Sequence, residues 1–444
     1  MPRQKVLFPE KGISQEELLN LMEESRKDDI KWREGKVFSL VYHASDKHFE
    51  TLEKAYTMFM EKNALSPMVF PALRKFETEV VAMTIDLFNG DRRCCGSVSS
   101  GGTESLLLAV KAYRDWAKDK FPDIKEPEMV APSSAHPSFD KAAEYFGVKL
   151  VSVPVDAKTH RADVKAMERA LTDNIILLVG SACDFPRGVV DPITEIAAIA
   201  KERGIGMHVD ACLGGYMLPF VKELGYDIPD FDFSVPGVTS MSADVHKYGY
   251  GAKGASTIMY KRENIWKYQF SVFTNWSGGI YISPTMRGTR PGGAMAAAWA
   301  SLKSLGRDGY LEKAKIVMDT TKRMLKGIEE IPELYILGEP DMSVFSFASD
   351  KIDVFHLADI MEEKGWHLDR LQFPAALHIM VNPHHAMIVD DLLTDLKISV
   401  EEAVKNPKQK ADGSAAMYGM VASLPDRDKV RDFVINFLKT QYKV

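Results

Sequence analysis

The stretch Ser-Ala-Asp-Val-His-Lys-Tyr-Gly-Tyr, residues 242–250, decides how this chain is interpreted, because it places His246 directly before Lys247 in a turn-like setting. Most lysines lie on a solvated surface, but the small and aromatic residues around this one are not typical of an exposed face. A lysine in such a turn is well suited to form an imine with an aldehyde. It attacks only as the neutral amine, so we expect burial or a nearby positive charge to lower the pKa of Lys247.

Two upstream segments add a possible anion site and a carboxylate. Residues 99–105, Ser-Ser-Gly-Gly-Thr-Glu-Ser, contain Gly102 and Thr103, whose backbone N–H groups and hydroxyl suit a phosphate at a helix start. The simpler interpretation is a glycine turn capped by Thr103. Residues 208–210, His-Val-Asp, end an apolar run, and the Asp210 carboxylate needs a partner there. Its simpler interpretation is an aspartate that caps the next turn.

A phosphate cup, a buried carboxylate and an imine-forming lysine, in this order, are what pyridoxal 5′-phosphate (PLP) requires of a protein. Asp210 would pair with the protonated pyridine nitrogen, and His246 would donate to the phosphate. His136 begins a helix after a strand and could stack on a flat ring, although a lone histidine is more often a local cap. Lys253 could serve as a second cation or a proton shuttle. The ordered set therefore predicts a PLP site.

The organisation of the chain agrees with this prediction. From residue 96, short β-rich runs alternate with helical stretches, which predicts a parallel or mostly parallel sheet with helices on both faces. Residues 261–295 read as loop-rich, a long helix follows at about 294–330, and a smaller α+β domain follows it. Ser14 is expected to cap an N-terminal helix over residues 14–29. The first β-rich run covers residues 96–100. Six more follow it, at 128–131, 149–154, 174–180, 205–210, 237–241 and 255–260.

Composition narrows the function classes. The 444 residues are 45% apolar and 27% charged with a net charge of −6, which fits a globular enzyme of two domains and gives no basic block for nucleic acid. None of the four cysteines forms a Cys-x-x-Cys pair, so we expect neither a metal site nor a disulfide framework, and a cytoplasmic location. No apolar run approaches a membrane span, and no transmembrane anchor is expected.

Several segments together resemble the group II branch of the PLP-dependent decarboxylases, of fold type I, and within it the sphingosine 1-phosphate lyase family. The resemblance covers roughly residues 36–440. It implies a large domain with a mostly parallel seven-stranded sheet flanked by helices, plus a smaller C-terminal α+β domain. The segments that carry it include Ser-Gly-Gly-Thr-Glu-Ser (100–105), Val-Ala-Pro-x-Ser-Ala-His (130–136), His-Val-Asp-Ala-Cys-Leu-Gly-Gly (208–215), Ser-Ala-Asp-x-His-Lys-Tyr-Gly-Tyr (242–250) and Arg-Pro-Gly-Gly (290–293).

The resemblance also implies roles and domain limits. It predicts an N-terminal helical segment over 1–70 that contributes to a dimer and its active sites, a PLP-binding domain over 71–310 and a small domain over 311–444. Lys247 matches the Schiff-base lysine, Asp210 the partner of the pyridine nitrogen and His136 the ring-stacking histidine. The phosphate cup matches Gly102, Thr103 and His246, with Cys212 in the same cofactor pocket; Gly288 and Thr289 match a loop from the other subunit, which implies a homodimer with shared active sites.

The substrate side is implied at Tyr42, Asn63, Tyr281 and Lys253, with Lys253 or Tyr42 as the base. The implied reaction is retro-aldol cleavage of a lipid-like phosphorylated amine to a long-chain aldehyde and phosphoethanolamine. One departure stands out, because the family pattern Asn-Pro-Leu-His-Pro reads Asn-Ala-Leu-Ser-Pro here, so Ser66 replaces a histidine that binds the substrate phosphate.

Two alternatives stay open. A group II amino acid decarboxylase would use the same lysine, aspartate and histidine, and the loss of the histidine at Ser66 favours it. A non-catalytic binding module on the same fold is the second alternative, against which the intact Lys247 argues. Analysis of the products distinguishes the decarboxylase from the lyase, because the decarboxylase releases carbon dioxide and the lyase releases an aldehyde.

Overall fold

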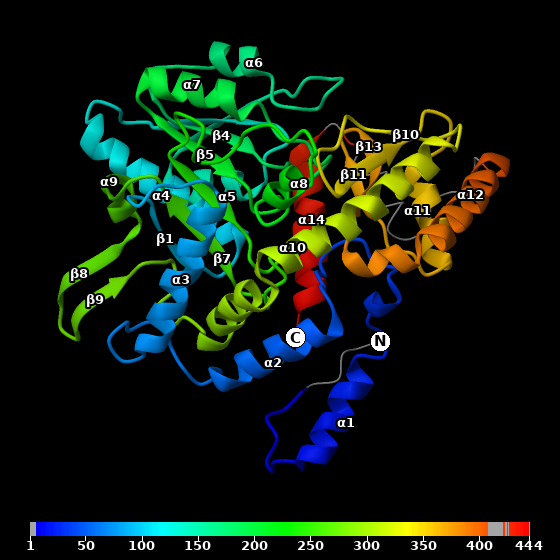
Figure 1. Ribbon diagram of the computed structural model, residues 1–444, viewed down its shortest axis with the longest axis horizontal. Helices are drawn as coiled ribbons and strands as arrows, with labels where there is room; N and C mark the ends of the chain where they lie inside the picture. The colour runs from blue at the N-terminus through cyan, green and yellow to red at the C-terminus, as the bar shows by residue number, and fades with distance from the viewer. Residues whose placement is uncertain (1–5, 407–420, 422–423, 425, 444) are drawn as a thin grey trace.

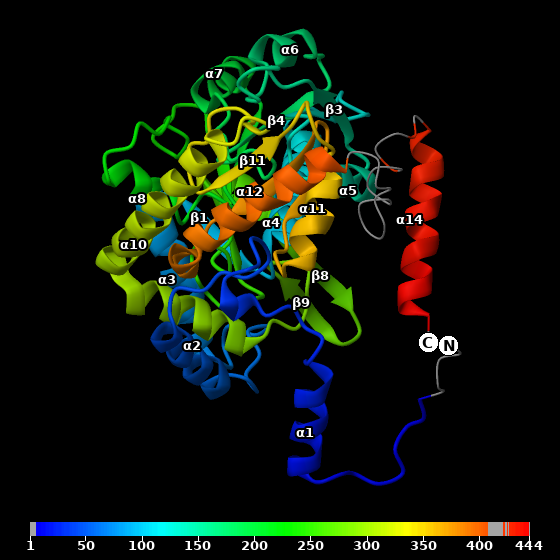
Figure 2. The same ribbon diagram turned by 90° about the vertical axis from the view of Figure 1, so that its right-hand side faces the viewer.

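The computed structural model describes residues 6–406, 421, 424 and 426–443. Figure 1 shows a large part built around a central sheet, with a smaller sheet and its helices beside it. Helix α1 (Gln15–Ser25) extends away from this body, and α14 (Arg427–Tyr442) lies along its periphery (Figure 2).

The central sheet has seven strands within the described residues, in the order β1-β7-β6-β5-β4-β2-β3. Strand β7 pairs antiparallel with both β1 and β6, whereas the remaining neighbours pair parallel. The predicted mostly parallel α/β architecture is therefore confirmed. The strands are β1 (Cys95–Ser99), β2 (Glu128–Pro132), β3 (Lys149–Val153), β4 (Ile175–Ser181), β5 (Gly206–Asp210), β6 (Ser240–Ala243) and β7 (Ser256–Tyr260).

Helices cover both faces of this sheet. Met129 and Ala131 of β2 belong to the hydrophobic core formed with α4 and α5, while Val130 between them belongs to the core formed with α3 and α7. Both faces of the central strands are therefore buried, which explains their near-continuous apolar sequences. The helices that flank the sheet are α3 (Pro71–Leu87), α4 (Gly102–Lys120), α5 (Ser138–Phe146), α6 (Val164–Arg169), α7 (Ile193–Arg203) and α8 (Leu218–Glu223).

The smaller sheet is antiparallel, in the order β10-β11-β13-β12. This confirms the predicted second α+β part, but strand β12 was not predicted, because Asp-Arg-Leu-Gln has two charged residues and only half-buried side chains. The elements are β10 (Tyr335–Ile336), β11 (Val344–Ala348), α11 (Val354–Glu363), β12 (Asp369–Gln372), β13 (Ala375–Met380), η3 (Pro383–Met387) and α12 (Val389–Lys405).

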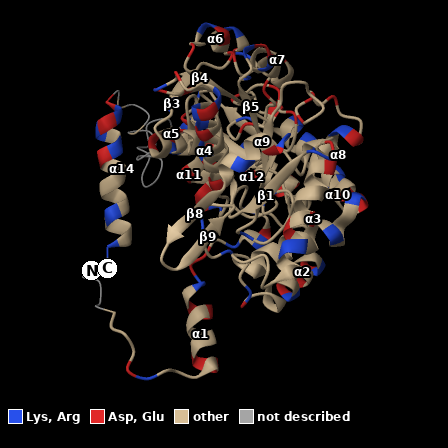
Figure 3. Cartoon of the chain, turned by 90° about the vertical axis from the view of Figure 1, so that its left-hand side faces the viewer, with Lys and Arg blue, Asp and Glu red and all other residues tan. Residues whose placement is uncertain are grey.

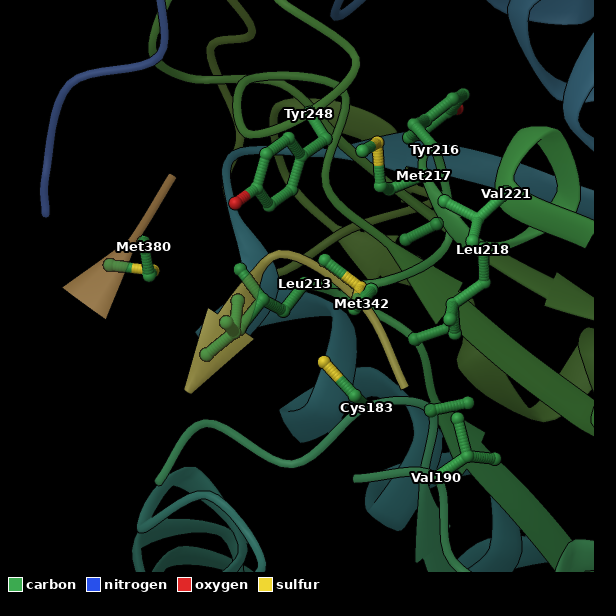
Figure 4. Packing of buried hydrophobic residues seen from close by; sticks show 14 of the residues in the cluster. Cys183, Val190, Leu213, Tyr216, Met217, Leu218, Val221, Tyr248, Met342 and Met380 are labelled. Atoms are coloured by element: carbon green, nitrogen blue, oxygen red, sulfur yellow. The ribbon is translucent and has the colours of Figure 1, made fainter. Parts of the chain in front are cut away.

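The two parts are joined by the long helix α10 (Gly292–Glu329), which is interrupted at Gly306, where φ is +57°. Figure 4 shows the core that they share, in which Leu213 and Met217 of the large part lie near Met342 and Met380 of the small part. The domain limits proposed from the sequence stay predictions, and the limit at 310/311 falls within α10.

The segment expected to be loop-rich contains an exposed hairpin, β8 (Ser271–Trp276) and β9 (Gly279–Ser283). Its strands bury almost no side chains, so no alternation of buried residues could signal them, and only Gly278 and Gly279 mark the turn. The hairpin has no charged residue, whereas the outer helices carry both signs of charge (Figure 3). The remaining elements are η1 (Trp32–Glu34), α2 (Asp46–Met58), α9 (Glu263–Trp266) and η2 (Lys267–Gln269).

Helix α1 begins as predicted, because the Ser14 hydroxyl accepts the Glu17 N–H at 3.1 Å. Its apolar residues are exposed, however, with Leu18 at 48% and Met22 at 58%. In the part of the chain that the structure describes, we find no helix that is both long and apolar enough to span a bilayer.

Candidate active site

The carboxyl ends of the central strands converge on a cavity of about 590 Å³. Such a crevice at the strand ends is where ligands bind in open α/β sheets. The structure brings nine of the predicted site residues to its walls: Tyr42, Gly102, Thr103, His136, Asp210, Cys212, His246, Lys247 and Lys253.

The N-terminus of α4 forms an open cradle on one side of this cavity. No side chain caps the helix at Gly101, so its first N–H groups remain available to an anion. A Cβ atom on Gly102 would lie 2.8 Å from Asp244 Oδ2 and 3.0 Å from Cys212 Sγ, so only glycine fits there. This cradle fits the phosphate of PLP in both shape and charge.

His246 borders the cradle. Its Nδ1 accepts the Ala255 N–H at 3.2 Å, so the proton of the neutral ring is on Nε2. Burial is the main cause that lowers the pKa of His246, and the ring is therefore a neutral donor at neutral pH. Its Cε1 lies 3.3 Å from the position of a Cβ on Gly101.

His136 and Asp210 occupy the ends of two parallel strands. His136 follows β2, and its Nδ1 accepts the Ser138 N–H at 3.1 Å, which orients the ring. Asp210 ends β5 and is 7% exposed. Its Oδ1 accepts the Cys212 N–H at 3.0 Å and the Ser242 hydroxyl at 3.4 Å, while Oδ2 has no hydrogen-bond partner among the residues that the structure describes. The free oxygen fits a protonated ring nitrogen.

The surroundings of Lys247 correct one expectation. Lys247 Nζ lies 2.9 Å from Asp244 Oδ2, and Asp244 is 1% exposed. Burial lowers the pKa of Lys247, but the charge of Asp244 outweighs burial, so the pKa is raised rather than lowered. The sequence reasoning missed Asp244, although its place three residues before the lysine, in the same turn, was visible.

Lys253 and Tyr42 lie next to each other in the wall of the cavity. Lys253 Nζ lies 4.9 Å from the centre of the Tyr42 ring, and the Tyr42 hydroxyl contacts Met380 Sδ at 3.2 Å. Burial and then the charge of Lys247 lower the pKa of Lys253 to about 8. Burial raises the pKa of Tyr42, so this hydroxyl keeps its proton.

The other predicted residues do not line this cavity. Asn63 Nδ2 donates to Thr289 Oγ1 at 3.3 Å, and the Tyr281 hydroxyl lies 3.2 Å from the position of a Cβ on Gly288. Ser66 lines a separate cavity of about 280 Å³ beside the β8–β9 hairpin. Within one chain these residues therefore lie apart from Tyr42 and Lys253, and their role on the substrate side stays a prediction.

One residue of the small part, Met380, also reaches the site, which the sequence did not indicate. Met380 of β13 lines the cavity together with Phe185, whose ring stacks on buried His378 with centroids 4.4 Å apart. Apolar side chains far away in the sequence carry no local signal of such a role.

The sheet, the anion cradle and the lysine after β6 define a class of protein, the enzymes that hold PLP through a lysine on this fold. Residues 4–349 match the family described as the pyridoxal-dependent decarboxylase conserved domain. Its members use the cofactor that the cradle, Asp210 and Lys247 fit.

Comparison with individual proteins narrows the class. The chain is 46% identical to a sphingosine-1-phosphate lyase of Arabidopsis thaliana, across 98% of this chain and 81% of that protein. The solved structure of a Burkholderia pseudomallei sphingosine-1-phosphate lyase matches with a TM-score of 0.91 at 39% identity, across 99% and 98% of the two chains. A probable L-aspartate decarboxylase of Pyrococcus abyssi is 35% identical, across 88% and 98%. The chain belongs to the pyridoxal-dependent decarboxylase family and, within it, to the sphingosine-1-phosphate lyases.

Proposed function

We propose that this protein cleaves the Cα–Cβ bond of a phosphorylated sphingoid base, sphingosine 1-phosphate or a similar molecule, to a long-chain aldehyde and phosphoethanolamine. The observation that carries the proposal is the 46% identity to the Arabidopsis lyase across 98% of the chain. The cavity supports it, because Lys253 and Tyr42 lie together where a substrate hydroxyl beside Lys247 would need a base and a donor.

Four parts of the cavity would hold the cofactor. Lys247 Nζ would bond to it, the α4 N-terminus with Thr103 and His246 would bind its phosphate, Asp210 would keep its ring nitrogen protonated, and His136 would pack against the ring. When bound, PLP supplies an electron-withdrawing ring next to the bond that breaks.

Lys253 is the residue that we assign as the base for the 3-hydroxyl. With a pKa of about 8, a useful fraction of it is neutral near physiological pH. Lys253 Nζ would take the proton of the 3-hydroxyl as the Cα–Cβ bond breaks and the aldehyde leaves, and a proton would have to return to Cα to complete phosphoethanolamine. Tyr42, which keeps its proton, donates a hydrogen bond to the same oxygen.

We further propose a homodimer in which each active site takes residues from both subunits. Asn63, Ser66, Tyr281, Gly288 and Thr289 would complete the site of the partner. Two observations support this arrangement: these residues lie outside the cavity of their own chain, and the β8–β9 hairpin beside them exposes apolar side chains, with Val272 at 57% and Phe273 at 61%.

Mixed dimers test the shared site. Lys247→Ala and Tyr281→Ala chains are each expected to be inactive, whereas an equal mixture regains up to about a quarter of wild-type activity, because half of the dimers then have one intact site. No recovery in mixtures that exchange subunits contradicts the shared site.

A substrate panel tests the reaction. Sphingoid 1-phosphates, their unphosphorylated forms and aromatic and acidic amino acids are supplied, and aldehyde and carbon dioxide are both measured. Aldehyde from the phosphorylated bases supports the lyase. Carbon dioxide from an amino acid, without aldehyde, overturns it in favour of the decarboxylase, the alternative that the serine at position 66 and the Pyrococcus relative favour.

We also propose a cytoplasmic location. The support is chemical, since Cys94, Cys95, Cys183 and Cys212 are all free thiols, which suits a reducing compartment. Fractionation of cells that express the tagged protein tests this proposal.

A further inference from the structure

The mechanism above gives no role to Asp244, a buried carboxylate at the site. Asp244 is 1% exposed, and its Oδ2 lies 2.9 Å from Lys247 Nζ and 3.7 Å from His246 Nε2. Its Oδ1 is buried and has no hydrogen-bond partner among the residues that the structure describes. A buried carboxylate is costly unless it is paired, and the Lys247 amine is the partner that compensates Asp244 here.

The backbone holds Asp244 and Lys247 in one tight turn. The Lys247 N–H donates to the Asp244 carbonyl at 3.1 Å, and the Asp244 N–H donates to the Cys212 carbonyl at 3.2 Å. The Asp244 carboxylate also lies against Gly102 at the start of α4. The lysine amine therefore has a fixed resting place between β6 and the anion cradle.

The other groups around this pair do not replace the carboxylate as a counter-ion. Neither His246 nor Lys253 can be an anion, and burial raises the pKa of Tyr42, Cys183 and Cys212, so this hydroxyl and these thiols stay neutral. Burial opposes a charge on Lys247 as well, and the carboxylate of Asp244 more than offsets it. Among the described residues, the titratable groups that interact with the pair include Tyr42, Cys183, Cys212, Tyr216, His246 and Lys253.

We propose that Asp244 is a positioning residue that holds Lys247 Nζ as an ammonium group whenever this amine is not bonded to the cofactor. The proposal rests on the role given to Lys247 above, but not on the identity of the substrate. When turnover frees the Lys247 amine, Asp244 would keep this amine in place and charged.

The proposal predicts how the free amine reacts. Nζ must lose its proton before it attacks an aldehyde carbon, after which water leaves and a C=N bond forms. An opposite charge in contact shifts a pKa by roughly 1–3 units, so removing it raises the neutral fraction of the lysine about tenfold or more. Asp244→Asn keeps the shape of the side chain and removes this charge.

The experiment strips the full-length protein of cofactor, adds pyridoxal at pH values from 6 to 10, traps the C=N bond with borohydride and measures modified Lys247 by mass spectrometry. Pyridoxal is used because it has no phosphate group. A faster reaction of the variant therefore cannot come from the loss of repulsion between Asp244 and a phosphate. We expect the wild-type rate to keep rising up to pH 10, and the D244N variant to react about tenfold faster or more at pH 8.

Asp184→Asn is the matched control, because Asp184 is also 1% exposed but faces Arg187 rather than Lys247. It is expected to keep the wild-type pH profile. A D244N profile that coincides with the wild type overturns the proposal. If D244N does not fold, a wild-type rate that levels off below pH 9 overturns it as well. Neither outcome depends on which bond the enzyme cleaves in its substrate, so a failure here is separate from a failure of the proposed reaction.

Discussion

Replacing Asp210 by asparagine tests whether this carboxylate keeps the cofactor ring protonated. The substitution preserves the hydrogen bond in which Oδ1 accepts the Cys212 N–H at 3.0 Å, so the local turn is retained. What it removes is a negative charge on a side chain that is only 7% exposed. The packing of β5 is unaffected, and the loss is electrostatic.

The magnitude follows from Coulomb's law. Two opposite charges about 4 Å apart at an effective dielectric constant of about 20 attract by about 4 kcal/mol. If this attraction supports the ring charge that draws in electrons as the bond breaks, its loss lowers kcat about a thousandfold, since 1.36 kcal/mol corresponds to tenfold.

The assay measures aldehyde release at saturating substrate, together with cofactor content per subunit by absorbance. Asp232→Asn is a suitable control, because Asp232 is another buried carboxylate but accepts a hydrogen bond from Asn89, away from the cavity. Its kcat is expected to stay near the wild-type value. A D210N enzyme with full cofactor content and a kcat within tenfold of wild type would refute the reasoning.

Three further predictions concern the base, the substrate phosphate and stability. A base with a pKa of about 8 acts when it is neutral, so kcat/KM should rise as the pH rises through 8. Lys253→Met should abolish that rise in a pH–rate profile. An unchanged profile excludes Lys253 as the base. Ser66→His should lower KM for a phosphorylated substrate about tenfold without changing KM for its unphosphorylated form, because it adds a charge-assisted hydrogen bond; equal effects on both substrates contradict a phosphate role. Asp341→Ala should lower the free energy of unfolding by about 3 kcal/mol, measured by urea denaturation, because it removes the carboxylate that pairs with the half-buried Arg161 guanidinium and that accepts the Val190 N–H. Asp390→Ala, which breaks only an exposed ion pair, is its control, and an equal effect of both would contradict this prediction.

The sequence was sufficient for features that depend on local chemistry. Runs of buried strands separated by helices predicted the central sheet, because side-chain burial repeats with the geometry of each element. Gly102 and Asp210 could be predicted as site residues from their local sequence. One is a glycine at a helix start, and the other is a carboxylate at the end of an apolar strand. The exposed hairpin β8–β9 escaped prediction because it buries too little to leave a pattern.

Tertiary structure decided what depends on neighbours in space. The sign of the pKa shift of Lys247 is set by the distance to Asp244, and the sequence shows both residues but not that their side chains meet at 2.9 Å. Chain folding also separated Ser66 and Tyr281 from the cavity that holds Tyr42 and Lys253. Electrostatic energy falls with distance and with exposure to water, and both quantities exist only once the chain is packed.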